Sequence, residues 1–419
     1  MTTDNARRSD AGGVVGLTAG ALQGVRVVDL SNHLAAPSAS MYLADFGADV
    51  VKVERPEVGD ELRRWGNRKD DAGLYFKVVN RGKKSVTADL RTPLGVEIAK
   101  RLCADADVVV ENYRTGTLAR WGIDHDVLSQ GNPGLVMLKV TGFGQSGPYR
   151  DRPGFGTLAE AFSGCAHITG TPEGPPLLPA FGLGDASTGL MGAFLVMVAL
   201  RERDRSGQGQ VIDLALYETL FTLLGPQVVD YDQLGIVQQR QGSRLPFVAP
   251  RNTFCTRDGR WVAIAGSTQS TFERICAALE VPQLAADPRF CENLLRIRNA
   301  TALDAALQAA IDHIDYSDLM ERFARADAAV APVNDVAMVL QDPQVQARRN
   351  VVAVPDEELQ APLRMQNVVG QMSRTPGHIR STGPRLGEHN HEILVQRLGF
   401  DPEQLRSQGI PIDTGDTPC

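Results

Sequence analysis

The chain has 419 residues, of which 43% are hydrophobic and 22% charged, and its net charge of −7 argues against a nucleic-acid-binding protein. Its length leaves room for two domains, one large and one small. The sequence contains no apolar run of about 18 residues, so we predict no membrane-spanning helix. The six cysteines form no Cys-x-x-Cys pair, which favours free thiols in a reducing cytoplasm.

Strands and helices alternate in the first half of the chain, after a leader of residues 1–22 that we expect to be disordered. The predicted strands are 25–30, 49–53, 108–110 and 135–140, and the predicted helices are 38–46 and 96–104. An apolar helix follows Asp185, and a further strand is predicted at 211–216. This alternation predicts a parallel sheet with helices on both faces, in a Rossmann-like layout.

The pattern changes after residue 225. Residues 226–252 are rich in Gln, Pro and Gly and are predicted to be a linker. A strand at 261–265 and helical segments at 271–280 and 300–325 predict a smaller domain, and the tail combines loops with a helix near 391–398. We therefore expect boundaries that separate residues 1–22, 23–225, 226–334 and 335–419.

Gly142–Gly147 matches the dinucleotide-binding pattern G-x-G-x-x-G and follows a predicted strand. Pro148 and the polar residues after it predict that no helix begins there to offer its N-terminus to a pyrophosphate. We therefore favour a backbone-rich loop beside a ligand over NAD binding.

His389 and His391 flank Asn390 and have the spacing of a possible metal pair. No third ligand lies at a suitable spacing. We predict a solvated pair in an exposed loop and no metal site.

Basic residues cluster in the N-terminal half of the chain. Many follow predicted strands, which is where open α/β sheets hold their ligands. In an acidic protein this clustering hints at a phosphate-bearing ligand, with an ordinary solvated surface as the alternative. The cluster comprises Lys52, Arg55, Arg63, Arg64, Arg81, Lys83, Lys84, Arg91, Arg114 and Arg120.

Asp185 ends a loop rich in glycine and proline, just before the apolar stretch Leu190–Leu200. A carboxylate at the start of a buried helix is either a cap or a reagent. Spacing alone favours an N-cap. The two roles are compatible, because a helix N-terminus stabilises a carboxylate and keeps it ionised, as a nucleophile requires.

Further motifs are distributed along nearly the whole chain, from Gly24 to about Phe400. They are Val50–Pro56 with Gly59-Asp60, Asn80–Val86, Val110–Tyr113, Gly142–Tyr149, Gly184-Asp185, Arg205–Gln210 and Leu386–Asn390. Together they resemble the class III CoA-transferases, the group of formyl-CoA transferase and carnitine CoA-transferase. The resemblance implies an α/β fold, with a Rossmann-like large domain built from both chain ends and a smaller α+β domain, in an interlocked homodimer.

The resemblance also implies that Asp185 is the nucleophile and that a coenzyme A thioester is a substrate, with no permanently bound cofactor. Arg55 matches an arginine at the nucleotide end of CoA, and Arg91 stands where the family often has lysine. The candidate CoA-binding residues implied in this way are Leu34, Arg55, Ala88, Leu90, Arg91, Asn112, Arg120 and Phe155.

Two departures from the family patterns narrow the expected reaction. Phe155 stands where the related racemases have a histidine, and without that base exchange of an α-proton is disfavoured. Leu245–Pro250 replaces a glycine-rich loop of the oxalate-handling members, whereas Pro153–Glu160 is closer to members that act on C4 and C5 dicarboxylic acids. We expect transfer of CoA to a carboxylic acid through an aspartyl anhydride and an aspartyl-CoA thioester, with intramolecular transfer or racemisation as alternatives.

Overall fold

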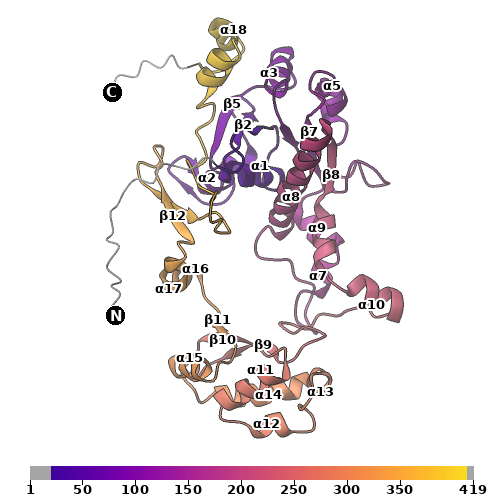
Figure 1. Cartoon of the computed structure of the whole chain (residues 1–419), viewed down its shortest axis with the longest axis vertical. Helices are drawn as coiled ribbons and strands as arrows, with labels where there is room; N and C mark the ends of the chain where they lie inside the picture. The colour runs from indigo at the N-terminus through magenta and orange to yellow at the C-terminus, as the bar shows by residue number, and fades with distance from the viewer. Residues whose placement is uncertain (1–19, 413–419) are drawn as a thin grey trace, which may run out of the picture. The chain divides into compact units, whose positions relative to one another are not determined.

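The computed structural model describes residues 20–412, so the predicted leader of residues 1–22 lies almost wholly outside the described residues (Figure 1). The chain divides into two compact units. The first comprises the described residues up to Pro153, Asp185–Ala215 and the described residues from Asn350 onward. The second comprises Gly154–Gly184 and Leu216–Arg349.

A six-stranded, entirely parallel sheet with the strand order β5-β2-β1-β6-β7-β8 forms the centre of the first unit. β1, β2, β6 and β7 contain short apolar runs, as expected for strands that are buried on both faces, whereas β5 has Val86 as its one apolar residue. The predicted mixed α/β fold with a central parallel sheet is thereby confirmed. The strands are β1 (Arg26–Asp29), β2 (Asp49–Glu54), β5 (Lys83–Thr87), β6 (Val108–Glu111), β7 (Val136–Thr141) and β8 (Val211–Ala215).

Helices accompany the strands of this sheet, and the C-terminal segment adds to the same core. Ile393 and Leu394 pack in one cluster with Val51 and Val86 of the sheet. The helices are α1 (Ala35–Asp45), α2 (Leu74–Val79), α3 (Pro93–Cys103), α4 (Thr117–Trp121), α5 (His125–Leu128), α8 (Leu183–Ser206), α18 (Pro402–Ser407), the 3-10 helix Glu61–Arg64 and the π-helix His391–Arg397. Short strand pairs are β3 (Arg68–Lys69) with β4 (Ala72–Gly73) and β12 (Val351–Val354) with β13 (Leu363–Gln366).

Helix α8 lies against α1 at glycines. A Cβ atom at Gly189 would lie 2.6 Å from the Ser38 Cβ and 2.9 Å from the Ala35 oxygen, so only glycine allows this approach. Gly192 faces Ala39 in the same way, with a Cβ 3.3 Å from the Ala39 Cβ. The matching order of these contacts shows that the two helices run parallel, with Gly189, the seventh residue of α8, beside the first turn of α1.

Helix α8 also differs from the expectation drawn from its sequence. Among the described residues it is long and apolar enough to cross a membrane by length and composition, although 44% of its most apolar stretch is buried inside the protein. A helix that is packed in the core of a protein can have the same length and composition. The close contact of Gly189 with α1 favours a core helix over a membrane span.

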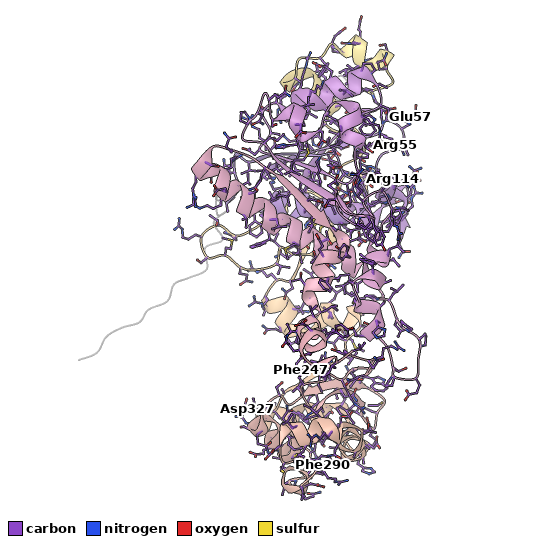
Figure 2. All side chains as sticks on the ribbon, turned by 90° about the vertical axis from the view of Figure 1, so that its right-hand side faces the viewer. Arg55, Glu57, Arg114, Phe247, Phe290 and Asp327 are labelled. Carbon is purple, nitrogen blue, oxygen red and sulfur yellow. The ribbon has the colours of Figure 1, made fainter. Side chains whose placement is uncertain are left out.

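The second unit contains an antiparallel sheet with the order β11-β10-β9. Helices pack on it around a core that includes Phe254, Phe272 and Phe290, the last of which is labelled in Figure 2. Its strands are β9 (Arg251–Cys255), β10 (Trp261–Ala265) and β11 (Val330–Pro332). Its helices are α6 (Gly156–Phe162), α7 (Cys165–Ile168), α9 (Leu216–Leu223), α10 (Gln227–Leu234), α11 (Gln269–Ala278), α12 (Gln283–Ala286), α13 (Asn293–Arg298), α14 (Ala300–Ile311), α15 (Tyr316–Arg325), α16 (Val336–Gln341) and α17 (Pro343–Ala347).

The predicted linker 226–252 is wrong in part, because helix α10 occupies Gln227–Leu234. This helix has no buried residue, and its large apolar side chains, Val228, Val229, Tyr231 and Leu234, are exposed. It ends at Gly235, which adopts a left-handed conformation with φ of 67°.

Candidate functional site

A cavity of about 380 Å³ opens at the carboxyl ends of the parallel strands. Open α/β sheets bind their ligands at this edge because the loops that follow the strands converge there. The lining comes from the segments that follow β1, β2, β5 and β6 and from α4. The lining residues are Asn32, His33, Val53, Arg55, Glu61, Ala88, Asp89, Leu90, Arg91, Asn112, Tyr113, Arg114 and Trp121.

Most of the predicted CoA-binding residues line this one cavity. They are Arg55, Ala88, Leu90, Arg91 and Asn112. Arg114, from the basic cluster, joins them, and Figure 2 shows Arg55 and Arg114 on the same side of the first unit. The cavity therefore combines three arginines with apolar side chains, which suits an anionic ligand with an apolar portion.

The remaining candidates lie elsewhere. Leu34 is buried in a cluster with Leu62, Phe76 and Val79 and does not line the cavity. Arg120 donates a hydrogen bond to the Thr117 hydroxyl at 2.9 Å and is also absent from the lining. Phe155 belongs to the second unit, where it precedes α6 and is 57% exposed.

A reciprocal amide pair fixes the loop after β1. The Asn32 backbone N–H donates to the Asn112 side-chain oxygen at 2.9 Å, and the Asn112 amide donates back to the Asn32 carbonyl at 2.7 Å. His33 follows with a φ of 67°, which is unfavourable for a residue with a side chain. Its N–H donates to Asp60 at 3.0 Å. Asn112 thus shapes the cavity wall, and sequence reasoning missed Asn32 and His33 because only their place after a strand indicated them.

Two acidic groups lie beside the arginines of the cavity. Asp89 accepts hydrogen bonds from the Arg91 side chain at 2.7 and 2.9 Å, and these hold the pKa of Asp89 below its usual range. Glu61 lies 3.4 Å from Arg55, and both side chains are about half exposed. A second cavity of about 300 Å³ shares Arg55, Asp89 and Arg91 with the first. These arginines therefore face two adjoining spaces.

Four members of the basic cluster do not line this cavity, which corrects part of the prediction drawn from that cluster. Three of these side chains are buried and that of Arg63 is partly buried, and all four pair with carboxylates, because a buried cation is tolerated only with a partner. The pairs are Lys52–Asp60 at 2.9 Å, Lys83–Asp29 at 2.9 Å, Arg63–Glu54 at 2.8 Å and Arg81–Asp45 at 2.6 Å.

Glu111, at the end of β6, is a buried acid directly before Asn112. Burial raises its pKa to about 7, against the opposing effects of the Tyr113 N–H and Lys139. The Tyr113 N–H donates to this carboxyl at 2.8 Å. Sequence reasoning missed Glu111 and Tyr113 as contributors, although the motif Val110–Tyr113 contains both. A buried carboxyl group with a raised pKa therefore directly precedes the cavity residues Asn112 and Tyr113.

Asp185 is the third residue of α8, since this helix begins at Leu183. The prediction that Asp185 is the N-cap is therefore wrong, because the residue lies inside the helix. Its carboxylate still lies in the first turn, where the helix dipole stabilises negative charge. Tyr75 is close to it. Burial raises the pKa of Tyr75, and the negative charge of Asp185 raises it further. Asp185 lies about one turn before Gly189, which contacts the first turn of α1, and α1 follows the cavity residues Asn32 and His33 in the chain.

The loop Gly142–Gly147 does not lead into a helix within the first unit, as predicted. The Gln145 N–H instead donates to the Asp213 carboxylate at 3.0 Å, in the middle of the neighbouring strand β8. Gly144 has a φ of 85°, which requires glycine. The loop is thus held by a side chain and presents no helix N-terminus to a dinucleotide.

The prediction of an exposed histidine pair is wrong. His389 is partly buried and its Nδ1 accepts a hydrogen bond from the Ser85 N–H at 3.2 Å, while His391 begins the π-helix. Burial lowers the pKa of His389. Among residues 20–412 no group of three or more His, Cys, Asp or Glu side chains is arranged to hold a metal ion.

Residues 22–390 match the family described as CoA-transferase family III. The chain belongs to this family. As a family III CoA-transferase it has relatives whose names specify their substrates. The succinyl-CoA–L-malate CoA-transferase beta subunit of Chloroflexus aurantiacus is 43% identical over 92% of this chain and 96% of the relative. The succinyl-CoA–D-citramalate CoA-transferase of the same organism is 40% identical over the same shares.

A solved structure also resembles this family III CoA-transferase. A CAIB/BAIF family protein from Brucella suis superposes with a TM-score of 0.80 and 35% sequence identity. The match covers 90% of this chain and 99% of the other. The enzyme therefore shares both sequence and fold with the family along most of its length.

Proposed function

We propose that this enzyme transfers CoA from succinyl-CoA to a dicarboxylic acid of four or five carbons, with Asp185 as the nucleophile. The observation that carries the proposal is the position of Asp185 in the first turn of α8, about one turn before the contact of Gly189 with α1, which itself follows residues of the arginine-lined cavity. The names of the two Chloroflexus relatives support both the donor and the class of acceptor.

The proposed reaction begins when the Asp185 carboxylate attacks the thioester carbonyl and the C–S bond breaks, which gives a mixed anhydride and CoA thiolate. The thiolate then attacks the aspartyl carbonyl of the anhydride and releases the donor acid, leaving an aspartyl-CoA thioester. The acceptor carboxylate attacks this thioester and expels the thiolate again. Finally, the thiolate attacks the acceptor's acyl carbon, which forms the new CoA ester and regenerates Asp185.

The first step is the most demanding, because a carboxylate with a pKa of about 4 displaces a thiolate with a pKa of about 8.5. The enzyme must therefore keep the thiolate near the anhydride and stabilise each oxyanion. We assign the first task to the cavity, where Arg55, Arg91 and Arg114 would hold the phosphates of CoA. Backbone N–H groups of the glycine loops are our candidates for the second task.

A substrate panel tests the proposed reaction. With succinyl-CoA as donor, we expect a new CoA ester with L-malate, D-citramalate or another dicarboxylic acid of this size, and no new ester without an acceptor. The same incubations in D₂O provide the control for racemisation. Deuterium incorporation at the α-carbon without any acceptor would show that the enzyme is a racemase, and conversion within one acyl-CoA would show intramolecular transfer.

We further propose that two like chains assemble into the predicted interlocked homodimer. One side of α8 exposes large apolar side chains at four-residue spacing, with Leu190 55%, Phe194 61% and Val198 50% exposed. A contiguous apolar stripe of this kind marks an interaction surface. A second copy of this chain is the expected partner, because the family resemblance implies a homodimer. We also propose a cytoplasmic location for the enzyme. Burial of this surface in the dimer would then explain the apolar character of α8 without a membrane.

Replacement of Phe194 by aspartate is expected to prevent this assembly, because it buries a charge in the apolar contact. Light scattering after size exclusion should show the mass of two chains for the wild type and of one chain for the variant. Asp204→Asn, at the exposed end of the same helix, is the matched control and should remain dimeric. A Phe194→Asp variant with the mass of the wild type would place the interface elsewhere.

A further inference from the structure

The residue before Asp185 is held by α6. Glu160, in the middle of α6, is 3% exposed, and its Oε1 accepts a hydrogen bond from the Gly184 N–H at 3.0 Å. Gly184 also touches the start of α6, where an added Cβ would lie 2.9 Å from the Gly156 oxygen and 3.2 Å from the Gly156 Cα. Gly184 is therefore fixed by one hydrogen bond and by one backbone contact that only glycine allows.

The hydrogen bond of Glu160 replaces a helix cap. The first N–H groups of a helix have no partner within that helix and need an acceptor from outside. Gly184 is the second residue of α8, and its N–H finds that acceptor in Glu160, which lies 24 residues earlier in the chain. The sequence pattern predicts Asp185 as a cap for the amides of the turn that follows it. The amide that precedes Asp185 is capped by Glu160.

Helix α6 is itself held in place by packing and hydrogen bonds. The ring of Phe162 meets the ring of Tyr217 from α9 edge to face, with 5.0 Å between their centroids. Ala159 is buried on the same helix, and the Ser163 hydroxyl donates to the Glu160 carbonyl at 3.3 Å. If position 160 served packing alone, an apolar side chain would be more favourable, because burial of a carboxyl group costs free energy unless it is hydrogen-bonded. The hydrogen bond from the Gly184 N–H therefore explains why a carboxyl group is buried at this position.

We infer that Glu160 is a positioning residue for the reaction: by holding Gly184, it sets the direction in which the next residue, Asp185, presents its carboxylate. This inference rests on the proposed role of Asp185 as nucleophile. Misplacement of a reacting group by about 1 Å costs on the order of 100-fold in rate. Loss of the acceptor is therefore expected to slow attack on the thioester and to leave binding of CoA nearly unchanged, since the cavity residues belong to other segments.

Three variants separate positioning from packing. Glu160→Gln keeps an acceptor oxygen and should retain kcat within about threefold, whereas Glu160→Leu keeps the bulk and should lower kcat by about 10- to 100-fold with little change in the KM for acyl-CoA. Gly184→Ala, which forces the turn away from Gly156, should repeat the kcat defect with Glu160 intact. Glu173→Leu, at an exposed site of the same unit, is the control without effect.

The decisive measurement is single-turnover labelling of Asp185 with acyl-CoA and hydroxylamine, followed by mass spectrometry. We expect the adduct in all variants, formed at the wild-type rate in Glu160→Gln and more slowly in Glu160→Leu and Gly184→Ala. Equal rates in Glu160→Leu and wild type, or an equal loss in Glu160→Gln and Glu160→Leu, overturn the positioning role while the nucleophile stands. If Glu160→Leu does not fold, the rate of Gly184→Ala decides. Absence of any adduct in the wild type overturns the nucleophile, and the inference with it.

Discussion

Replacement of Asp185 by alanine is expected to reduce CoA transfer by about 10⁴-fold or more, because removal of a covalent nucleophile leaves only the binding contribution to catalysis. The fold should persist, since Asp185 is only partly buried in the first turn of α8 and the neighbouring N–H of Gly184 keeps its acceptor in Glu160. Binding of CoA should also persist, because Asp185 does not line the cavity that contains Arg55 and Arg91. The expected signature is therefore a loss in kcat with little change in acyl-CoA affinity.

Covalent trapping distinguishes this explanation from a structural defect. Wild-type enzyme incubated with acyl-CoA and then with hydroxylamine should carry a hydroxamate at Asp185, detectable by the mass of one peptide. Asp185→Asn is the matched control, because it keeps the shape of the side chain and removes its nucleophilic charge, and it should acquire no label. Full exchange activity in Asp185→Ala would show that another group forms the intermediate, and binding of CoA without any label in the wild type would indicate a CoA-binding protein.

Five of the six strands of the sheet could be predicted from the sequence because they contain short apolar runs, whereas β5, with Val86 as its one apolar residue, could not. Val27, Val51 and Val109 lie in β1, β2 and β6, and each is buried in the sheet. The identity of five cavity residues could also be predicted, because the family resemblance implied them as CoA-binding residues. Asn32 and His33 could not, since the wall they form depends on the order β2-β1-β6, which brings Asn112 to Asn32 from 80 residues away.

Which basic residues are buried and which face the cavity could not be predicted either, because this also depends on how the strands pair. Lys52 and Arg55 are three residues apart, yet Lys52 is buried and Arg55 faces the cavity. The difference arises because Lys52 lies inside β2 next to Asp29 on the paired strand β1, whereas Arg55 follows the end of β2. The start of α8 was misjudged for a related reason, because the group that caps Gly184 comes from α6 and not from the adjacent sequence.

Replacement of Lys52 by methionine is expected to destabilise the first unit by about 3–5 kcal/mol, the usual cost of removing one partner from a buried ion pair. The Lys52 ammonium lies 2.9 Å from Asp60 and 3.9 Å from Asp29, and all three side chains are fully buried. Burial alone would lower the pKa of Lys52, but Asp29, Asp60 and Glu54 raise it above its ordinary value. Methionine fits the space and leaves two buried carboxylates without this cation. The midpoint of urea unfolding should fall accordingly.

Lys84→Met is the matched control for this prediction, because Lys84 also contacts two carboxylates, Asp49 at 3.4 Å and Glu392 at 2.9 Å, yet all three side chains are at least one-third exposed. Its loss should cost about 1 kcal/mol or less. Asp60→Asn added to Lys52→Met should restore part of the stability, since it removes one of the uncompensated charges. Equal effects of Lys52→Met and Lys84→Met would show that burial does not determine the strength of these pairs.

The pH dependence of stability provides an independent measure of the same network. Burial alone would raise the pKa of Asp29, but Lys52 and Lys83 hold it well below its usual range. The folded state thus favours the ionised carboxylate, so its contribution is fully present above the unfolded pKa of about 4 and is lost as the pH falls below that value. In Lys52→Met this acid-induced loss should be smaller, because the depressed pKa depends on Lys52. Since Lys52 also donates to the Ser31 carbonyl at 2.7 Å, directly before Asn32 and His33, the variant should in addition raise the KM for acyl-CoA.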